Sequence, residues 1–143
     1  MKIFYKTSAT SVGGRDGRTQ VDDGSLGLDL VGFQNESGKE GANPEQLFAM
    51  GYAACFDNAI IHVAPTLGIK PTKHSTTVGV GIGQKPDGAF SFEIDISITV
   101  EGISLEEAKT LIEKAHSTCP YSNATRGNVD VRLHVNVMQT FDL

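Results

Sequence analysis

A long, mostly apolar stretch in the first half of the chain constrains the fold more than any other feature. Asn43 suits the N-cap of a helix, Pro44 suits its first position, and Glu45 lies at the positive end of the helix dipole. We therefore predict a helix from Asn43 to about Ala64. Because apolar residues occur on nearly every side of it, this helix has to be covered nearly all round, which favours cover from a second subunit.

Alternating apolar and polar residues predict the strands. They cover residues 1–10, 19–21, 26–33, 78–83, 90–100 and 129–137. Glycine-rich turns are predicted at 13–18 and 85–88, and a capping box of Ser104 with Glu107 starts a second helix. Helices segregated from antiparallel strands predict an α+β fold, and the length fits a single domain over residues 1–143.

The composition argues against several classes of protein. The formal net charge of −5 and the absence of a cluster of Lys and Arg argue against a nucleic-acid partner. No unbroken apolar run approaches the roughly 18 residues that a membrane span needs. Residues 1–6 alternate instead of forming the apolar block of a signal peptide. We therefore expect a cytoplasmic protein with no membrane partner.

Cysteine occurs only twice, at Cys55 within the predicted long helix and at Cys119 after the second helix. In the cytosol a lone disulfide is more often catalytic or redox-sensing than structural. Each residue also has a plainer interpretation, Cys55 as a small buried hydrophobe and Cys119 as an inert residue at a helix end. A metal site would add His62 and His116. Because Cys55 and His62 lie about 10 Å apart along a helix, unlike the close-set ligands of zinc sites, no metal is expected.

A reactive Cys55 needs a cation from elsewhere in the fold. An unperturbed thiol has a pKa of roughly 8.5, and burial among apolar residues raises the pKa because the thiolate is poorly solvated there. Lys and Arg are scarce near Cys55 in the sequence. The residues alone leave redox chemistry and simple packing open.

Three segments resemble one known family. They are residues 13–17 (Gly-Gly-Arg-Asp-Gly), residues 43–56 (from Asn-Pro-Glu-Gln-Leu-Phe to Gly-Tyr-Ala-Ala-Cys-Phe), and residues 115–128, which end in Cys-Pro-Tyr-Ser-Asn-Ala-Thr-Arg-Gly-Asn. With the order of elements and the chain length, they make the chain similar to the organic hydroperoxide resistance (Ohr) proteins of the OsmC/Ohr family over essentially its whole length. The last run points to the Ohr branch rather than to OsmC proper.

The resemblance implies a fold, an activity and a site. The OsmC-like fold would have an antiparallel sheet, a long central helix and a second helix, in an intertwined homodimer with two active sites at its interface. The activity would be a thiol-dependent reduction of organic hydroperoxides, with Cys55 as the peroxidatic thiol and Cys119 as the resolving thiol. Arg15 would be the activating cation, and Glu45 the carboxylate that orients it. No cofactor would be bound, and the reductant would be a dithiol, either dihydrolipoamide or a lipoylated protein.

Two physical points bear on these roles. A guanidinium keeps its charge at any working pH and can bridge a thiolate and a carboxylate, so Arg15 supplies the cation that Cys55 needs. Glu45 and Cys55, however, lie about 15 Å apart on one straight helix. Two such helices packed antiparallel about a two-fold axis would bring Glu45 of one chain near Cys55 of the other. The choice of Arg15 over Arg18 rests on the family pattern, and Arg126 is interpreted as structural.

The apolar residues near Cys55 bear on the substrate. Phe48, Tyr52 and Phe56 would favour an alkyl or acyl hydroperoxide over hydrogen peroxide, and a plain core role fits each of them equally well. Three other functions stay open: a redox sensor that uses the same thiols, a carrier of acyl or lipid ligands, and a protein with a structural disulfide. Turnover with a dithiol would exclude the sensor, and ligand binding that survives loss of both cysteines would favour the carrier.

Overall fold

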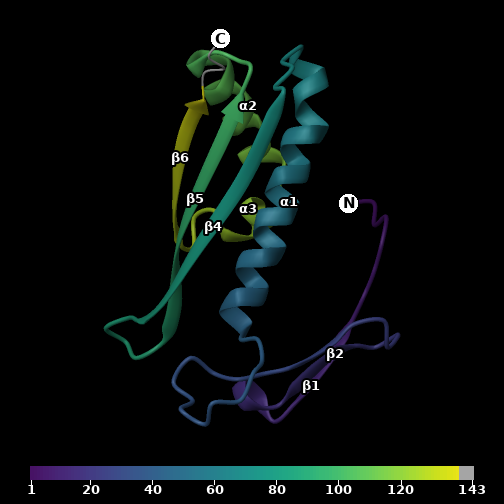
Figure 1. The fold of residues 1–143 in the computed structure, drawn as a ribbon, viewed down its shortest axis with the longest axis vertical. Coiled ribbons are helices and arrows are strands. Elements are labelled where there is room, and N and C mark those ends of the chain that lie inside the picture. The colour runs from purple at the N-terminus through teal and green to yellow at the C-terminus, as the bar shows by residue number, and fades with distance from the viewer. Residues whose placement is uncertain (139–143) are drawn as a thin grey trace. The chain divides into compact units, whose positions relative to one another are not determined.

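The computed structural model describes residues 1–138 and contains two compact units. The N-terminal unit, Met1–Leu47, holds three strands, a short 3-10 turn and the first turn of the long helix. The C-terminal unit begins at Phe48 and holds the remaining elements (Figure 1). The elements are, in chain order, β1 (Ala9–Val12), η1 (Gly14–Asp16), β2 (Arg18–Val21), β3 (Gly27–Asp29), α1 (Pro44–Leu67), β4 (Lys73–Gln84), β5 (Phe90–Glu101), α2 (Leu105–Thr118), α3 (Pro120–Thr125) and β6 (Asp130–Met138).

The N-terminal unit is built on a small antiparallel sheet in the order β1-β2-β3. Gly13 and Gly14 have φ of 86° and 64°, in the left-handed region that favours glycine, and they turn the chain back from β1 toward β2. The strand predicted over residues 1–10 is wrong at its start, because pairing with β2 begins only at Ala9. The strand predicted over 26–33 shrinks to β3, the part that pairs with β2. Alternation alone does not make a strand where a pairing partner is missing.

Helix α1 begins where the sequence predicts. The Asn43 side chain accepts a hydrogen bond from the backbone N–H of Gln46 at 2.8 Å, and the Gln46 side chain accepts one from the backbone N–H of Asn43 at 3.0 Å. This reciprocal cap satisfies two backbone donors that the first turn of a helix leaves without partners. The cap therefore fixes the start of the helix that carries Glu45 and Cys55.

The predicted end of α1 at Ala64 is wrong, because Pro65 does not stop the helix. A proline in the last turn has a helical φ and gives up only a single hydrogen bond. The helix stops instead at Gly68, whose φ is 66°. The N–H of Gly68 bonds the carbonyl of Pro65 at 3.2 Å, and the N–H of Ile69 bonds the carbonyl of Ala64 at 3.1 Å. These two bonds form a Schellman motif, which satisfies the last carbonyls of the helix.

The C-terminal unit is built on a second sheet, in the order β4-β5-β6. β4 and β5 form a long antiparallel hairpin, and its turn lies at residues 85–88 as predicted. β6 pairs with β5 in parallel, so the prediction of a wholly antiparallel sheet is wrong for this pair. The reason is the connection: α2 and α3 lie between β5 and β6 in the chain and form a crossover, which parallel neighbours require. Residue alternation carries no information about strand direction.

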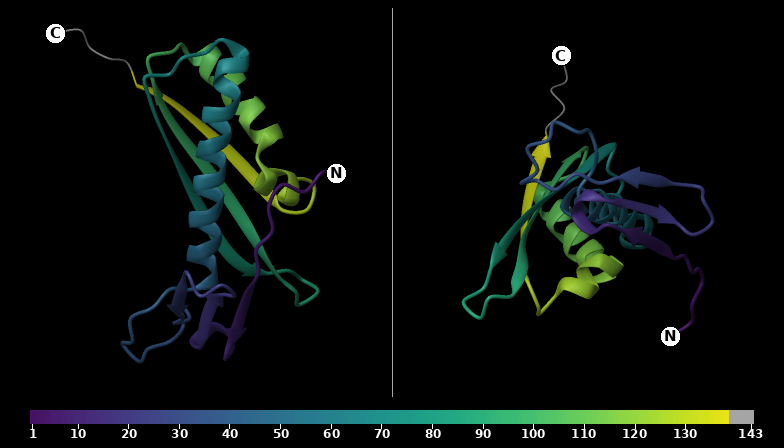
Figure 2. Two further views of the ribbon diagram at one scale, coloured as in Figure 1. Left: turned by 90° about the vertical axis from the view of Figure 1, so that its right-hand side faces the viewer. Right: turned by 90° about the horizontal axis from the view of Figure 1, so that it is seen from below.

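The three helices cover one face of this second sheet (Figures 1 and 2). The covered face of β5 is fully buried and consists of Ile94, Ile96, Ile98 and Val100. The helices contribute the buried side chains of Tyr52, Phe56, Ile60, Val63, Ala108, Leu111, Ile112 and Ala115. This arrangement confirms the predicted α+β class. The prediction of a single further helix missed α3, a short helix that follows α2 after one residue.

Helix α1 is covered on one face only within a single chain. Met50 is 66% exposed and Ile61 57% exposed, and Ala54 and Asn58 lie on the same exposed stripe. By length and composition alone, α1 is also long and apolar enough to cross a membrane, although it contains no unbroken apolar run of that length, and 33% of that stretch is buried inside the fold. Its other face packs into the core of the C-terminal unit. If α1 is covered nearly all round, as the sequence predicts, another surface has to pack on this exposed stripe.

The end of α1 gives a clean test of backbone conformation. Gly68→Ala is expected to lower the free energy of unfolding by about 1 kcal/mol, because alanine adopts the left-handed region poorly. A Cβ added at Gly68 meets no atom within 4 Å, so no steric clash contributes. Gly83→Ala in β4 is the matched control, since its surroundings are equally open and its φ is not left-handed. Urea denaturation measures both variants, and an equal effect of the two would contradict the explanation.

Candidate active site

The two cysteines come together in the C-terminal unit. Cys55 lies in the middle of α1 and is partly buried, whereas Cys119 is fully buried between α2 and α3. Cys119 caps the end of α2 and the start of α3, and its backbone is extended, with φ −63° and ψ 123°. Both residues are free thiols, and they lie close enough for Cys119 to raise the pKa of Cys55. The fold therefore brings together the two sulfur atoms that are far apart in the sequence.

A glycine allows α3 to approach α1 this closely. A Cβ at Gly51 would lie 2.5 Å from the hydroxyl oxygen of Tyr121, much closer than two such atoms can approach. Tyr121 follows Cys119 by two residues, and Gly51 precedes Cys55 by one turn of helix. The absence of a side chain at Gly51 is therefore part of what places the two thiols side by side.

The surroundings of Cys55 in this unit disfavour its thiolate. Burial raises the pKa of the Cys55 thiol above its ordinary value, and the neighbouring thiol of Cys119 raises the pKa further. The backbone N–H of Tyr121 donates a hydrogen bond to Cys55, which lowers the pKa but does not outweigh the other two effects. A nucleophilic Cys55 at neutral pH therefore needs a cation, as the sequence analysis inferred from its apolar neighbours.

Arg15 and Glu45 form a bidentate ion pair in the N-terminal unit. Nη2 of Arg15 lies 2.6 Å from Oε1 of Glu45, and Nη1 donates a hydrogen bond to Oε2 at 2.7 Å. The Glu45 side chain is 11% exposed and that of Arg15 44% exposed. The hydrogen bond to Arg15 lowers the pKa of Glu45 below its ordinary range, so the carboxylate stays charged. The contact that the family resemblance implies between these two residues is present, while their catalytic roles stay predictions.

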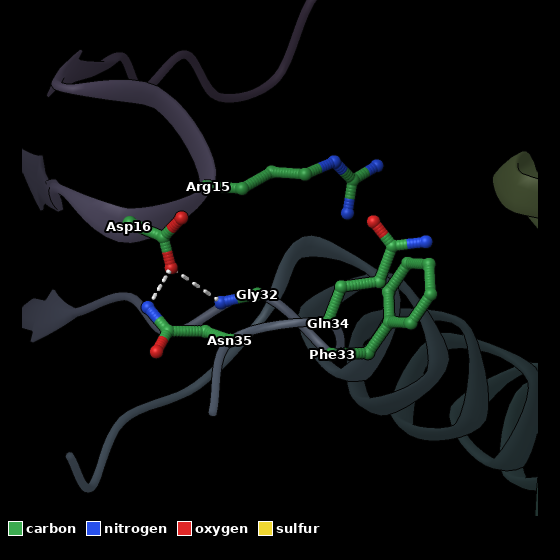
Figure 3. Close-up of a pocket in the computed structure, with 6 residues that line it drawn as sticks. All are labelled: Arg15, Asp16, Gly32, Phe33, Gln34 and Asn35. Atoms are coloured by element: carbon green, nitrogen blue, oxygen red, sulfur yellow. Dashed lines mark hydrogen bonds between the residues drawn. The ribbon is translucent and has the colours of Figure 1, made fainter. Parts of the chain in front are cut away.

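Asp16 fixes the turn that carries Arg15. Its Oδ1 accepts hydrogen bonds from the backbone N–H of Gly32 at 3.0 Å and from Nδ2 of Asn35 at 2.6 Å, and these bonds lower the pKa of Asp16 (Figure 3). A pocket of about 190 Å³ lies here, and Arg15, Asp16, Gly32, Phe33, Gln34 and Asn35 line it. Sequence reasoning missed Asp16 and Asn35 as partners. Only the spatial fold shows that the loop at Asn35 returns to the turn at Asp16.

The other two arginines considered from the sequence are engaged elsewhere. Arg18 lies 2.9 Å from Oδ1 of Asp29, on the neighbouring strand of the N-terminal sheet. Arg126 donates hydrogen bonds to the carbonyl oxygen of His116 and to Oδ1 of Asn123, both at 2.6 Å. The bond to His116 satisfies a carbonyl near the end of α2, which agrees with the structural interpretation of Arg126.

The three aromatic residues proposed for substrate contact lie at different depths. Tyr52 and Phe56 are fully buried, and Phe48 is partly buried beside the core. The ring of Phe48 lies 6.0 Å from that of Tyr52 and 6.0 Å from that of Tyr121, in edge-on arrangements. Burial places Tyr52 and Phe56 in the core role that the sequence analysis left open. Contact of any of the three with a substrate stays a prediction.

His116, one of the four residues considered for a metal site, has a protein partner. Its Nδ1 lies 2.8 Å from Oγ of Ser122, a residue that sequence reasoning missed. Within residues 1–138, no group of three or more His, Cys, Asp or Glu side chains is placed to hold a metal ion. Pro120 at the first position of α3 is the one local signal that could have indicated the helix that carries Ser122.

The ion pair predicts a pH dependence of stability. Because the pKa of Glu45 is lowered in the folded chain from an ordinary value of 4.5, its stabilising effect is complete above that value and is lost as the pH falls through the lowered pKa. The difference in free energy of unfolding between wild type and Glu45→Gln should therefore be largest near neutral pH and should shrink below about pH 4. Urea denaturation across this range measures it. Glu40→Gln, at an exposed glutamate of the same unit, is the control, and a difference that does not change with pH would contradict the assignment.

Comparison with known proteins places the chain in a family. Residues 36–134 match the family model described as OsmC-like protein. The organic hydroperoxide resistance protein of Xanthomonas axonopodis pv. citri (strain 306) is 47% identical over 135 residues, which cover 92% of this chain and 94% of that protein. Two crystal structures of organic hydroperoxide resistance proteins share the fold. The protein from Elizabethkingia anophelis superposes with a TM-score of 0.89 and 44% identity, over 96% of this chain and 100% of that chain. OhrB of Bacillus subtilis superposes with a TM-score of 0.86 and 40% identity, over 92% of this chain and 98% of that chain. The chain belongs to the OsmC-like family, in its branch of organic hydroperoxide resistance proteins.

Proposed function

We propose that this protein is a thiol-dependent peroxidase that reduces organic hydroperoxides to alcohols. The observation that carries the proposal is the pair of free thiols, Cys55 partly buried in α1 and Cys119 fully buried beside it. The name of the Xanthomonas relative, an organic hydroperoxide resistance protein, supports the substrate class. A redox pair of this kind, recycled by a dithiol, also fits a cytoplasmic location.

The proposed reaction proceeds in three steps. The Cys55 thiolate attacks the distal oxygen of the hydroperoxide, the O–O bond breaks, and the alkoxide leaves and takes up a proton to form the alcohol. Cys55 becomes a sulfenic acid, and the sulfur of Cys119 displaces its hydroxide, which leaves as water while a disulfide forms. A dithiol then reduces this disulfide by two exchange steps and is itself oxidised to a disulfide. A dihydrolipoyl group, free or carried on a lipoylated protein, is the proposed dithiol, and the protein itself holds no cofactor.

Arg15 is the proposed activating cation. Because burial and Cys119 raise the pKa of Cys55, a fixed positive charge is the missing component. Glu45 holds the Arg15 guanidinium by two contacts, which orients it and keeps it charged. Arg18 is the weaker candidate, since it already pairs with Asp29. The guanidinium would also hydrogen-bond the peroxide and stabilise the charge that develops on its oxygen.

The proposed assembly is an intertwined homodimer in which α1 of one chain packs antiparallel on α1 of the other. The exposed stripe of α1, which includes Met50, Ala54 and Ile61, is the apolar surface that such packing would cover. Glu45 of one chain would then lie near Cys55 of its partner and carry Arg15 to that site. Full activity of dissociated monomers would contradict this arrangement.

The proposed substrate is an alkyl or acyl hydroperoxide. Of the three aromatic residues considered for substrate contact, Phe48 is the one that remains partly accessible beside the core, and the buried rings of Tyr52 and Phe56 would form the apolar wall behind it. An apolar wall favours a substrate with an organic group over hydrogen peroxide, which has none to bury. The carrier of acyl or lipid ligands is the alternative that uses the same wall without the thiols.

The first test is peroxide consumption by the purified protein, with dihydrolipoamide as reductant and with cumene hydroperoxide and hydrogen peroxide compared. We expect faster turnover with the organic peroxide. Cys55→Ser should abolish turnover, because the attacking sulfur is gone. Cys119→Ser should consume one equivalent and then lose Cys55 to over-oxidation, because the sulfenic acid has no partner. Mass spectrometry identifies the oxidised forms.

The outcomes separate the alternatives. Wild-type turnover in both cysteine variants would reject the assignment of the two thiols. Oxidation of the wild-type thiols without turnover by the dithiol would favour a redox sensor. Binding of an acyl ligand that is unchanged when both cysteines are replaced would favour the carrier, and a large loss of stability on reduction would indicate a structural disulfide.

The second test compares the two arginines. Arg15→Gln should raise the pKa of Cys55 by about 1 to 3, because a cation close to the thiolate is removed. Arg18→Gln is the matched control: it removes the same charge from the same unit at a residue that pairs with Asp29. The pH dependence of Cys55 alkylation by iodoacetamide, measured in the Cys119→Ser background, gives the pKa. An equal rise in both variants, or none in Arg15→Gln, would contradict the role of Arg15.

A further inference from the structure

A single buried hydroxyl connects the three helices around the thiol pair. Oγ of Ser122 lies 2.7 Å from the hydroxyl oxygen of Tyr52 and 2.8 Å from Nδ1 of His116. Tyr52 belongs to α1, His116 to α2 and Ser122 to α3. The side chains of Ser122 and Tyr52 are fully buried, so water does not reach this contact from outside. A fully buried serine has to satisfy its hydroxyl group within the protein, and Ser122 does so with one side chain from each of the other two helices.

Each partner lies about one helical turn from a thiol. Tyr52 precedes Cys55 by three residues in α1. His116 precedes Cys119 by three residues, and Ser122 follows it by three. Because one turn of helix contains about 3.6 residues, Tyr52 lies on the same side of α1 as Cys55, and His116 and Ser122 lie in the turns on either side of Cys119. The hydroxyl contact is thus placed where it can control the distance between the two sulfur atoms.

The directions of the hydrogen bonds follow from the charge state of His116. Burial and the nearby Arg126 lower the pKa of His116, so the ring is neutral at neutral pH. With its proton on Nε2, Nδ1 of His116 accepts a hydrogen bond from the Ser122 hydroxyl. The Ser122 oxygen then accepts a hydrogen bond from the Tyr52 hydroxyl, so Tyr52, Ser122 and His116 form one continuous series of hydrogen bonds. Removal of the Ser122 hydroxyl leaves a buried donor and an acceptor unpaired.

The position of Cys119 depends on how α3 docks. Cys119 has extended backbone angles between two helices, so α2 alone does not fix its side chain. α3 contains only six residues, too few for a helix to be stable by itself. Its side chain contacts must hold it, and Ser122 lies in its first turn. Thr125, in its last turn, adds a longer contact of 3.4 Å to the same Tyr52 hydroxyl.

We propose that Ser122 is a positioning residue, whose bonds to Tyr52 and His116 hold Cys119 where its sulfur can capture the oxidised Cys55. The inference rests on the proposed peroxidase function and assigns Ser122 to one step of it. Disulfide formation tolerates little error in geometry, with Cβ atoms about 3.5–4.5 Å apart. Attack on the peroxide needs only Cys55 and its cation. Loss of the Ser122 hydroxyl should therefore slow disulfide formation and leave the first step nearly unchanged.

The test follows both steps in the full-length protein after one equivalent of cumene hydroperoxide. Ser122→Ala should lose Cys55 thiol at nearly the wild-type rate but form the disulfide about tenfold more slowly. More Cys55 should then reach the sulfinic acid when peroxide is in excess, as mass spectrometry would detect. Ser117→Ala is the matched control, because Ser117 is exposed and its hydroxyl bonds only the carbonyl of Lys114, at 2.8 Å.

A second variant, Tyr52→Phe, tests the proposal even if Ser122→Ala does not fold. Tyr52→Phe removes the hydroxyl and keeps the ring, so it should slow the same step in the same direction. The double variant should be no slower than the slower single variant, because both remove one chain of bonds. Disulfide formation at the wild-type rate in Ser122→Ala and Tyr52→Phe would overturn the proposal, as would an equal slowing in Ser117→Ala.

Oxidation by diamide separates this inference from the peroxidase function. Diamide joins two thiols without a peroxide, and it also needs Cys119 to capture an adduct on Cys55. If peroxide fails to oxidise the wild-type thiols, the proposed function is wrong, and the diamide rates of wild type and Ser122→Ala still test the position of Cys119. Equal diamide rates would then overturn the positioning role.

Discussion

Burial of one face of α1 against β5 is the interaction on which the C-terminal unit depends. Four fully buried side chains of β5 belong to the same core cluster as Tyr52 and Phe56 of the helix, and each such side chain stabilises the fold by about 1.5–3 kcal/mol. The same helical face determines where the candidate nucleophile lies. Cys55 lies at the edge of the buried face. Its side chain is only partly buried, so a small molecule can reach it from solvent, and burial raises the pKa of its thiol, so the thiol keeps its proton.

The proposed chemistry is divided between two pairs of residues, and α1 contributes one member to each. Its first turn carries Glu45, which pairs with Arg15, and its middle carries Cys55, which lies beside Cys119. The first pair is strongly polar and fixed by hydrogen bonds, and the second is apolar and fixed by packing. A thiol that burial keeps protonated and an arginine that a carboxylate keeps oriented are complementary, since each lacks what the other supplies.

Features with a local cause could be predicted from the sequence. The reciprocal cap at Asn43, the hairpin turn at 85–88 and the alternation of β5 each depend on residues a few positions apart. The two cysteines stand out because the chain has only two, whereas Arg15 and the roles of both thiols came from a family resemblance, because spacing alone does not show that distant residues meet. The direction of β6 and the partners of Asp16 and Ser122 depend on contacts between distant segments, which periodicity does not encode. Pro65 does not indicate the end of α1, because a proline in the last turn is compatible with a helix, and the left-handed Gly68 ends it instead.

The parallel pairing of β6 has a consequence for how the thiol pair comes into being. Cys119 lies within the crossover between β5 and β6, and non-local parallel pairing of this kind is intrinsically slow to form. During synthesis, Cys55 leaves the ribosome well before Cys119 and remains without its partner until the last strand docks. A nascent or partly unfolded chain therefore holds two isolated thiols of ordinary reactivity. Formation of the proposed disulfide between Cys55 and Cys119 therefore has to wait until the fold around Cys119 is complete.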